Sequence, residues 1–279
     1  MDGILDYNYN KLFASVQSLH KTNAVIQLSY MFESASLLPK IISNELRILE
    51  KINYNANSLE LLADYNNIDD RFFPRKGSNL GLIAKYTANS NMKINLMATD
   101  STPKMSFDVE GKGSFLYRIY QRTIWPLGKK VSIGMQNSLS FNFLNQGDSA
   151  IISTNFVNDN YIGGFRKITP NTRPFWGAEQ LRYYAENLFY NEFSFQYEFK
   201  RNMFLQLVTQ YYQANPLGFI FTSVKDGNYI FDGDNYIFGV GASLAYRSPI
   251  GPLSFSVGKG NTGNKLMYNI NIGFYFDRN

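Results

Sequence analysis

The chain has no cysteine and a single histidine, His20, among its 279 residues. The missing cysteines exclude a disulfide framework, a redox dithiol and a Cys/His zinc site. A histidine-dependent triad would have to be built around His20, which falls in an expected hairpin and is interpreted as a solvated turn residue. We therefore expect no metal site, no cofactor and no catalytic constellation, and the chain is predicted not to be an enzyme.

Long apolar runs, clustered charge and an export signal are missing as well. No window approaches the run of about 18 apolar residues that a membrane helix needs. The first residues lack the basic and apolar regions of a secretory signal. The 27 basic and 22 acidic residues leave a net charge of +5, and the 20 tyrosines and 23 phenylalanines are not interleaved with clustered basic residues. This composition predicts no nucleic-acid partner.

What the chain does have, almost everywhere, is alternation of apolar and polar residues. Near the C-terminus, for example, Phe255 and Ile272 belong to apolar faces, while Ser256 and Asn271 belong to polar ones. Many of these alternating segments exceed the usual length of strands in soluble sheets. The pattern predicts about twelve strands, near residues 5–18, 22–33, 43–54, 57–68, 77–90, 108–125, 128–144, 186–199, 202–213, 235–247, 251–258 and 265–276.

Short turns and long connections alternate between these strands. The turns at 126–128 and 248–251 are short, whereas the connections at 145–185 and 214–234 are long and polar. This layout is typical of an outer-membrane barrel, in which one face of each strand contacts lipid. The polar faces carry Gly, Ser, Asn and Gln, which suit a wet lumen, and aromatic residues stand at strand ends. We predict an all-β fold, an antiparallel transmembrane β-barrel. A soluble sandwich or lipocalin-like barrel is the alternative, because alternation does not tell which face is outside.

Three short motifs with catalytic or cofactor associations are interpreted as structural. The segment Gly258–Gly263 matches the dinucleotide fingerprint, but an alternating strand follows it instead of a helix, so we expect a hairpin loop. The segments 241–245 and 147–149 resemble lipase signatures, yet neither lies at a strand-to-helix turn.

The longest connection contains a cluster of glycine, proline and aromatic residues. A connection of about 40 residues is long enough to fold back, and paired glycines permit backbone conformations closed to other residues. We expect this loop to enter the lumen, where a guanidinium would need an acidic partner. The alternative is an external loop whose arginine is solvated. The residues concerned are Ile162, Gly163, Gly164, Phe165 and Arg166, followed by Pro170, Pro174, Phe175 and Trp176, with Glu192 or Glu198 as possible lumen partners of Arg166.

Taken together, several segments resemble the C-terminal barrel of the BamA-type outer-membrane superfamily, also called bacterial surface antigen. Their order and spacing match, and the chain looks most like the barrel fused to patatin-like phospholipases. The family's lumen-loop signature, Val-Arg-Gly-[Phe/Tyr], aligns with 162–165, so that the family's arginine is Gly163 here, unless Arg166 substitutes for it. The segments are Asp69–Gly77, Trp125–Gly128, Ile162–Arg166, Tyr246–Leu253 and the aromatic final strand.

The resemblance also implies an extent and a function. Such barrels have sixteen strands, so residues 1–279 would form a single barrel domain that lacks four N-terminal strands and any periplasmic repeats or patatin domain. The implied function is that of a non-catalytic translocator or anchor in the bacterial outer membrane, which inserts, secretes or displays a polypeptide. Membrane lipid and a polypeptide passenger or periplasmic domain would be its partners. The alternative is a passive diffusion pore.

Overall fold

The computed structural model describes most of the chain as β-structure. The described residues are 5–20, 23–39, 49–96, 104–144, 160–165, 172–179, 183–185, 187–214, 216, 236–263 and 265–273. Within these ranges, eleven strands form one antiparallel sheet and three short strands form a second sheet. No helix in the same ranges is long and apolar enough to cross a membrane.

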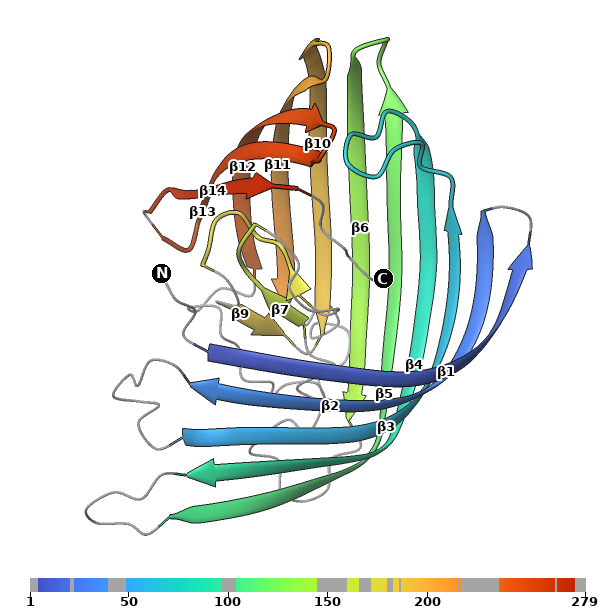
Figure 1. Ribbon diagram of the computed structural model, residues 1–279, viewed down its shortest axis with the longest axis vertical. Helices are drawn as coiled ribbons and strands as arrows, with labels where there is room; N and C mark the ends of the chain where they lie inside the picture. Colours follow the sequence, from blue (N-terminus) through green and yellow to red (C-terminus); the bar gives the residue numbers. More distant parts are fainter. Residues whose placement is uncertain are drawn as a thin grey trace.

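The large sheet follows chain order and curves around the small one (Figure 1). Among the described strands, β1 and β14 pair on one side only, so the sheet is open between them. The small sheet, in the order β8-β7-β9, belongs to the connection between β6 and β10. The strands are β1 (Leu5–His20), β2 (Ala24–Pro39), β3 (Leu49–Asn66), β4 (Gly77–Leu96), β5 (Met105–Pro126), β6 (Val131–Leu144), β7 (Asn160–Ile162), β8 (Thr172–Arg173), β9 (Tyr183–Ala185), β10 (Leu188–Lys200), β11 (Met203–Ala214), β12 (Tyr236–Ser248), β13 (Gly251–Gly260) and β14 (Met267–Ile272).

The all-β fold with an antiparallel main sheet is confirmed, with one correction to the long strands and the addition of the short strands β7, β8 and β9. The two strands expected near 43–54 and 57–68 are a single strand, β3, in their described part. The break expected at residues 55–56 does not occur, because the asparagines at 53, 55 and 57 alternate with Tyr54 and Ala56, which are buried on the inner face. His20 is exposed and lies in the expected hairpin, paired with Ala24, but it is the last residue of β1 and not part of the turn.

The apolar face of the large sheet is its exposed face. Ile272 is 71% exposed and Phe255 is 48% exposed, whereas Ser256 is 5% exposed. Exposed leucines, isoleucines and aromatic residues occur on the same face of the other long strands. An apolar surface of this extent does not occur on soluble monomers, but it is the lipid-contacting surface of a transmembrane barrel. The predicted orientation of these strands is therefore confirmed.

The polarity of the two faces reverses along β2, β3 and β4: the outer face changes from apolar to polar, and the inner face from polar to apolar. On the outer face of β3, exposed Leu61 and Leu59 are followed by Asn55, which lies opposite Ser34 of β2 and Asn91 of β4. On the inner face the order is reversed, because a buried polar cluster around the Glu33–Lys85 ion pair is followed by a buried apolar cluster. That apolar cluster contains Ala35, Tyr54, Ala56, Met92 and Ile94. We infer that the lipid-contacting belt of β3 ends between Leu59 and Asn55 and that the strand continues beyond it.

This boundary can be tested with arginine at two positions on the same face of β3. Leu61→Arg places a charge in the apolar belt and should lower the free energy of unfolding by about 2–4 kcal/mol, whereas Asn55→Arg should cost less than about 1 kcal/mol. The measurement is urea unfolding of the chain in phospholipid vesicles. Equal costs at the two positions would show that the belt does not end between them.

Candidate functional site

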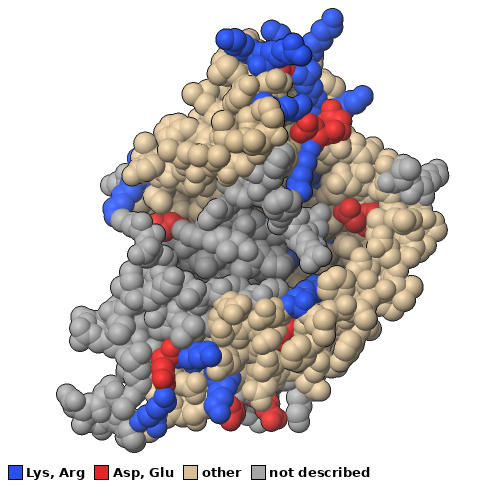
Figure 2. All heavy atoms as spheres, viewed as in Figure 1, with Lys and Arg blue, Asp and Glu red and all other residues tan. Residues whose placement is uncertain are grey.

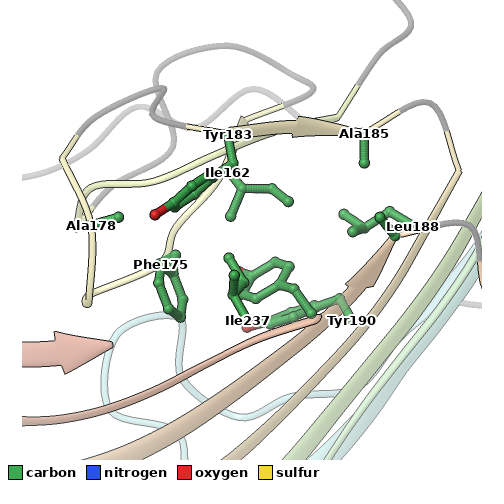
Figure 3. Close-up of a cluster of buried hydrophobic side chains, with 10 residues drawn as sticks. Ile162, Phe175, Ala178, Tyr183, Ala185, Leu188, Tyr190 and Ile237 are labelled. Atoms are coloured by element: carbon green, nitrogen blue, oxygen red, sulfur yellow. The ribbon is translucent and has the colours of Figure 1, made fainter. Parts of the chain in front are cut away.

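The connection between β6 and β10 lies against the inner face of the large sheet. Its strand β7 pairs in parallel with β8 and antiparallel with β9. Ile162 and Phe175 from this connection are fully buried, in a cluster with side chains of the large sheet (Figure 3). The cluster comprises Ile162, Phe175, Ala178, Tyr183, Ala185, Leu188, Tyr190, Tyr212, Ala214 and Ile237. The described part of this loop therefore lies inside the curve of the large sheet.

Gly163 and Gly164 hold the turn of this lumen loop through backbone hydrogen bonds. The Gly163 N–H donates to the carbonyl of Arg173 (3.0 Å), and the Gly164 N–H donates to the carbonyl of Ala178 (3.0 Å). The φ angles of the two glycines are 139° and 75°, a region that residues with a Cβ rarely adopt. Gly163, which the sequence resemblance aligns with the family's arginine, therefore has a backbone conformation that disfavours any side chain.

Beneath the loop, four glycines of β12 and β13 form a flat surface, here called the glycine platform. A Cβ atom on Gly239 would lie 2.6 Å from the Phe175 ring, and one on Gly260 would lie 2.9 Å from it. Cβ atoms at the other two positions would overlap Trp176. The platform comprises Gly239, which lies opposite Gly260, and Gly241, which lies opposite Gly258. The absence of side chains on it leaves the space that the loop segment Phe175–Gly177 occupies.

Polar side chains of β10 and β11 fix the same segment. The Gln210 amide oxygen accepts from the Trp176 N–H (3.0 Å), and its amide nitrogen donates to the Pro174 carbonyl (3.2 Å) and to Glu192 (2.9 Å). The Tyr212 hydroxyl donates to the same Pro174 carbonyl. Glu192 therefore lies on the inner face and is connected to the loop through Gln210.

A second anchor joins the loop to β5 and β6, which precede β10 in the order of the sheet. Asn160 of β7 is fully buried and accepts a hydrogen bond from the Arg118 guanidinium of β5 (3.3 Å). Its amide nitrogen donates to the Ser140 hydroxyl of β6 (3.4 Å) and to the carbonyl of Ala185 (3.3 Å). The loop is thus bound to β5 and β6 on one side and to β10–β13 on the other.

Other site residues behave differently from the sequence analysis. Arg166 lies outside the described residues, so its pairing with an acid stays a prediction. Glu198 contacts Arg75 and accepts from the Asn202 N–H (3.0 Å), far along β10 from Glu192. Sequence analysis missed the glycine platform, although two Gly-x-Gly triplets on successive strands, 239–241 and 258–260, were a visible signal. The hairpin interpretation of 258–263 is confirmed.

At the other end of the sheet, the turn between β3 and β4 reaches the strands β10–β12. Phe73 of this turn is 3% exposed and stacks on Phe204 of β11, with ring centroids 4.1 Å apart and an interplanar angle of 7°. The Gln196 amide of β10 donates to the Pro74 carbonyl (3.1 Å). These contacts join strands that are far apart in the order of the sheet.

Charged side chains reinforce this β3–β4 turn. Arg247 of β12 donates to the Asp70 carboxylate (2.7 Å), and Arg75 forms an ion pair with Glu198 of β10. Arg75 also donates to the carbonyl of Lys129 in the β5–β6 turn (2.9 Å). The turn therefore connects three other turns or strand ends across one end of the molecule.

Comparison with known proteins identifies the class of this structure. The family model described as the Omp85 superfamily domain matches residues 3–277, so the chain belongs to the Omp85 superfamily. No curated protein matches the chain. The crystal structure of BamA from Haemophilus ducreyi lacking POTRA domains 1-3 is similar, with a TM-score of 0.57 and 13% identity over 95% of this chain and 53% of that chain. CdiB from Acinetobacter baumannii gives a TM-score of 0.45 and 12% identity over 94% of this chain and 49% of that chain.

The comparisons confirm the fold prediction and leave the finer predictions untested. The likeness to BamA confirms the predicted BamA-type barrel fold, and the chain spans about half the length of that structure. The closer resemblance to patatin-fused barrels, the twelve-of-sixteen strand estimate and the N-terminal truncation stay predictions.

The glycine platform leads to a test of the lumen loop. In Gly258→Ala, the new methyl group meets the backbone of Trp176, which cannot rotate away, so the loop must move. Overpacking of this kind should cost about 1–3 kcal/mol. In a Trp125→Phe background, Trp176 is the only tryptophan, and its emission should shift to the red. The control is Gly263→Ala, which has no atom within 4 Å of the new Cβ; a spectrum equal to that of the control would contradict the contact.

The β3–β4 turn leads to a second test. Phe73→Ala removes a fully packed ring stacked on Phe204, and it should lower the free energy of unfolding by about 3–5 kcal/mol. Leu127→Ala, at an exposed turn tip of the same end, should cost well under 1 kcal/mol. Chemical unfolding in detergent micelles measures both. A small effect of Phe73→Ala would mean that the turn contributes little to stability.

Proposed function

We propose that this chain is the membrane barrel of a translocator or anchor in the bacterial outer membrane, which acts on a polypeptide and performs no catalysis. The observation that carries the proposal is the lumen loop, which is bound to β5 and β6 through Asn160 and to strands between β10 and β13 through the segment Pro174–Gly177. Membership of the Omp85 superfamily supports the same conclusion.

The packing of the loop favours a translocator over a passive pore. A diffusion pore needs an open path lined by polar side chains. In this chain the inner face of β12 and β13 is covered at the glycine platform by aromatic residues, and the adjacent hydrogen bonds of Gln210 are satisfied by the loop. The loop held by these contacts fills part of the lumen, and a polypeptide would have to pass beside it or displace it.

The residues of the chain support a non-catalytic role. His20, the only histidine, is exposed at the end of β1. The acids Glu192 and Glu198 are each engaged in structural contacts. If the parent protein hydrolyses lipid, the activity would reside in an attached domain of the patatin-like kind that the sequence resemblance implies.

The proposal is tested by adding an unfolded client to vesicles that contain this chain. A urea-unfolded outer-membrane barrel protein is diluted into the vesicles, and its folding is followed by its heat-modifiable mobility on gels. We expect the wild-type chain to accelerate folding by at least about tenfold over empty vesicles, which corresponds to about 1.4 kcal/mol of barrier reduction.

Two controls give the experiment its meaning. The variant Gly263→Ala should retain the acceleration, whereas Gly258→Ala should change it because the loop is displaced. Conductance is recorded in planar bilayers on the same preparations. Steady, loop-independent conductance without any acceleration of folding would support the passive pore and contradict the proposal.

A further inference from the structure

The short-turn end of the sheet carries a concentration of positive charge. Figure 2 shows lysine and arginine side chains gathered at the end where the β5–β6 and β10–β11 turns lie in Figure 1. All of these side chains are exposed. The group, here called the basic rim, consists of Arg71, Arg75, Lys76, Lys129, Lys130, Lys200, Arg201 and Arg247.

Hydrogen bonds make the basic rim one continuous surface. The Arg75 guanidinium binds the carbonyl of Lys129 (2.9 Å), and the carbonyl of Lys130 accepts from the Glu198 N–H (2.8 Å). The Arg247 N–H donates to the carbonyl of Asn202, which follows Arg201 (2.8 Å). The four turns that supply the rim are therefore fixed against one another.

The rim has a large excess of positive charge. Its four turns, at 67–76, 126–130, 198–203 and 247–251, contain eight basic and only three acidic residues, an excess that equals the net charge of +5 of the whole chain. The three acids are already used: Asp69 and Asp70 accept backbone N–H groups of their own turn, Asp70 also binds Arg247, and Glu198 binds Arg75.

Most of the remaining cations have no acidic partner within the described residues. Lys76, Lys129, Lys130, Lys200 and Arg201 form no salt bridge there and are exposed to solvent. Elsewhere the charges are balanced more closely. At the far ends of β3 and β5, for instance, Lys104 is paired with Glu50 at 2.7 Å. The rim thus presents several unneutralised cations on a rigid support.

Aromatic residues on the lipid-facing side place the rim at a membrane surface. Trp125, Tyr197, Phe199 and Tyr246 are exposed on the outer face, within a few residues of the basic turns. Aromatic residues of this kind stand at the level of the lipid headgroups. Lysine and arginine side chains just beyond them reach the same level, because their long stems extend along apolar surface.

We propose that the basic rim binds the headgroup phosphates of anionic phospholipids in the leaflet that surrounds the short turns. Clustered lysines and arginines next to a membrane surface attract anionic lipids electrostatically, and guanidinium groups match phosphate geometry. The binding would concentrate anionic lipid around this end of the barrel. The inference does not depend on whether the chain is a translocator.

A lipid occupant is favoured over an acidic protein by the apolar tips of the same turns. Leu127 and Ile250 are 62% and 67% exposed, next to the basic residues and the exposed aromatics. Cations and exposed aliphatic side chains at the edge of a lipid-facing belt match the boundary between phosphates and acyl chains. An acidic protein surface would satisfy the cations but leave these tips without apolar cover.

Trp125 gives a site-specific test, because it is one of only two tryptophans and Trp176 lies against the inner face. The chain is inserted into phosphatidylcholine vesicles that contain a minor fraction of phosphatidylglycerol. Two preparations are compared, and both contain the same amount of lipid with brominated acyl chains, which quench tryptophan emission. In the first the brominated lipid is phosphatidylglycerol, and in the second it is phosphatidylcholine. We expect at least about twofold stronger quenching by the anionic lipid at low salt, and nearly equal quenching in about 1 M salt.

Matched variants connect the effect to the rim. The preference should be lost in a variant that combines Lys129→Gln, Lys130→Gln, Lys200→Gln and Arg201→Gln. None of these side chains makes a salt bridge in the described structure, so they are the cations available to bind lipid phosphates, and their removal breaks no ion pair. Removing four charges away from the rim, at Lys51, Lys93, Lys259 and Lys265, should leave it intact. Trp125→Phe reports the residual emission of Trp176. Equal quenching by both lipids in the wild type, or a preference that survives in the rim variant, overturns the proposal; equal quenching would favour a soluble acidic protein as the partner.

Discussion

The apolar face of this sheet contacts lipid, so packing of that face cannot hold the interior of the barrel together. In a soluble barrel, inward apolar side chains bring distant strands together. Here one apolar face of the long strands is exposed, and much of the inner face carries small polar pairs such as Ser243 and Ser256, whose hydroxyls are 2.9 Å apart. Backbone ladders join only neighbouring strands. Contacts between distant strands therefore come from two inserted segments, the lumen loop and the β3–β4 turn.

The lumen loop and the β3–β4 turn join distant strands through different kinds of contact. The lumen loop relies on close backbone approach: the glycine platform removes side chains from β12 and β13, so that Trp176 and Gly177 reach the strand backbone itself. Gln210 then satisfies the loop's polar groups at Pro174 and Trp176. The β3–β4 turn relies on one stacked aromatic pair, Phe73 and Phe204, enclosed by ion pairs. A wet lumen allows both solutions, because polar groups at their edges can remain hydrated.

Sequence reasoning was strongest where the signal is local. Alternation alone predicted the faces of the strands, because side-chain orientation in a strand has a period of two. It was wrong at β3, where two strands were expected although Tyr54 and Ala56 continue the inner face without a break. The lumen position of Ile162–Phe165 was predicted from the resemblance and the glycine content. The partners of the loop were not, because the platform exists only once register sets Gly239 opposite Gly260.

The same constraint accounts for the difference between the two ends of the barrel. A lipid-facing belt excludes charge, so ionic groups collect beyond it. At the far end of β3 the outer face continues with Asn55 opposite Asn91 and Asn53 opposite Lys93, and Lys104 is paired with Glu50. At the short-turn end, the acids that could balance the lysines are engaged in folding the β3–β4 turn against β10 and β12. The ion pairs of the β3–β4 turn therefore have two consequences: they join the turn to β10 and β12, and they leave the lysines of the basic rim without acidic partners among the described residues.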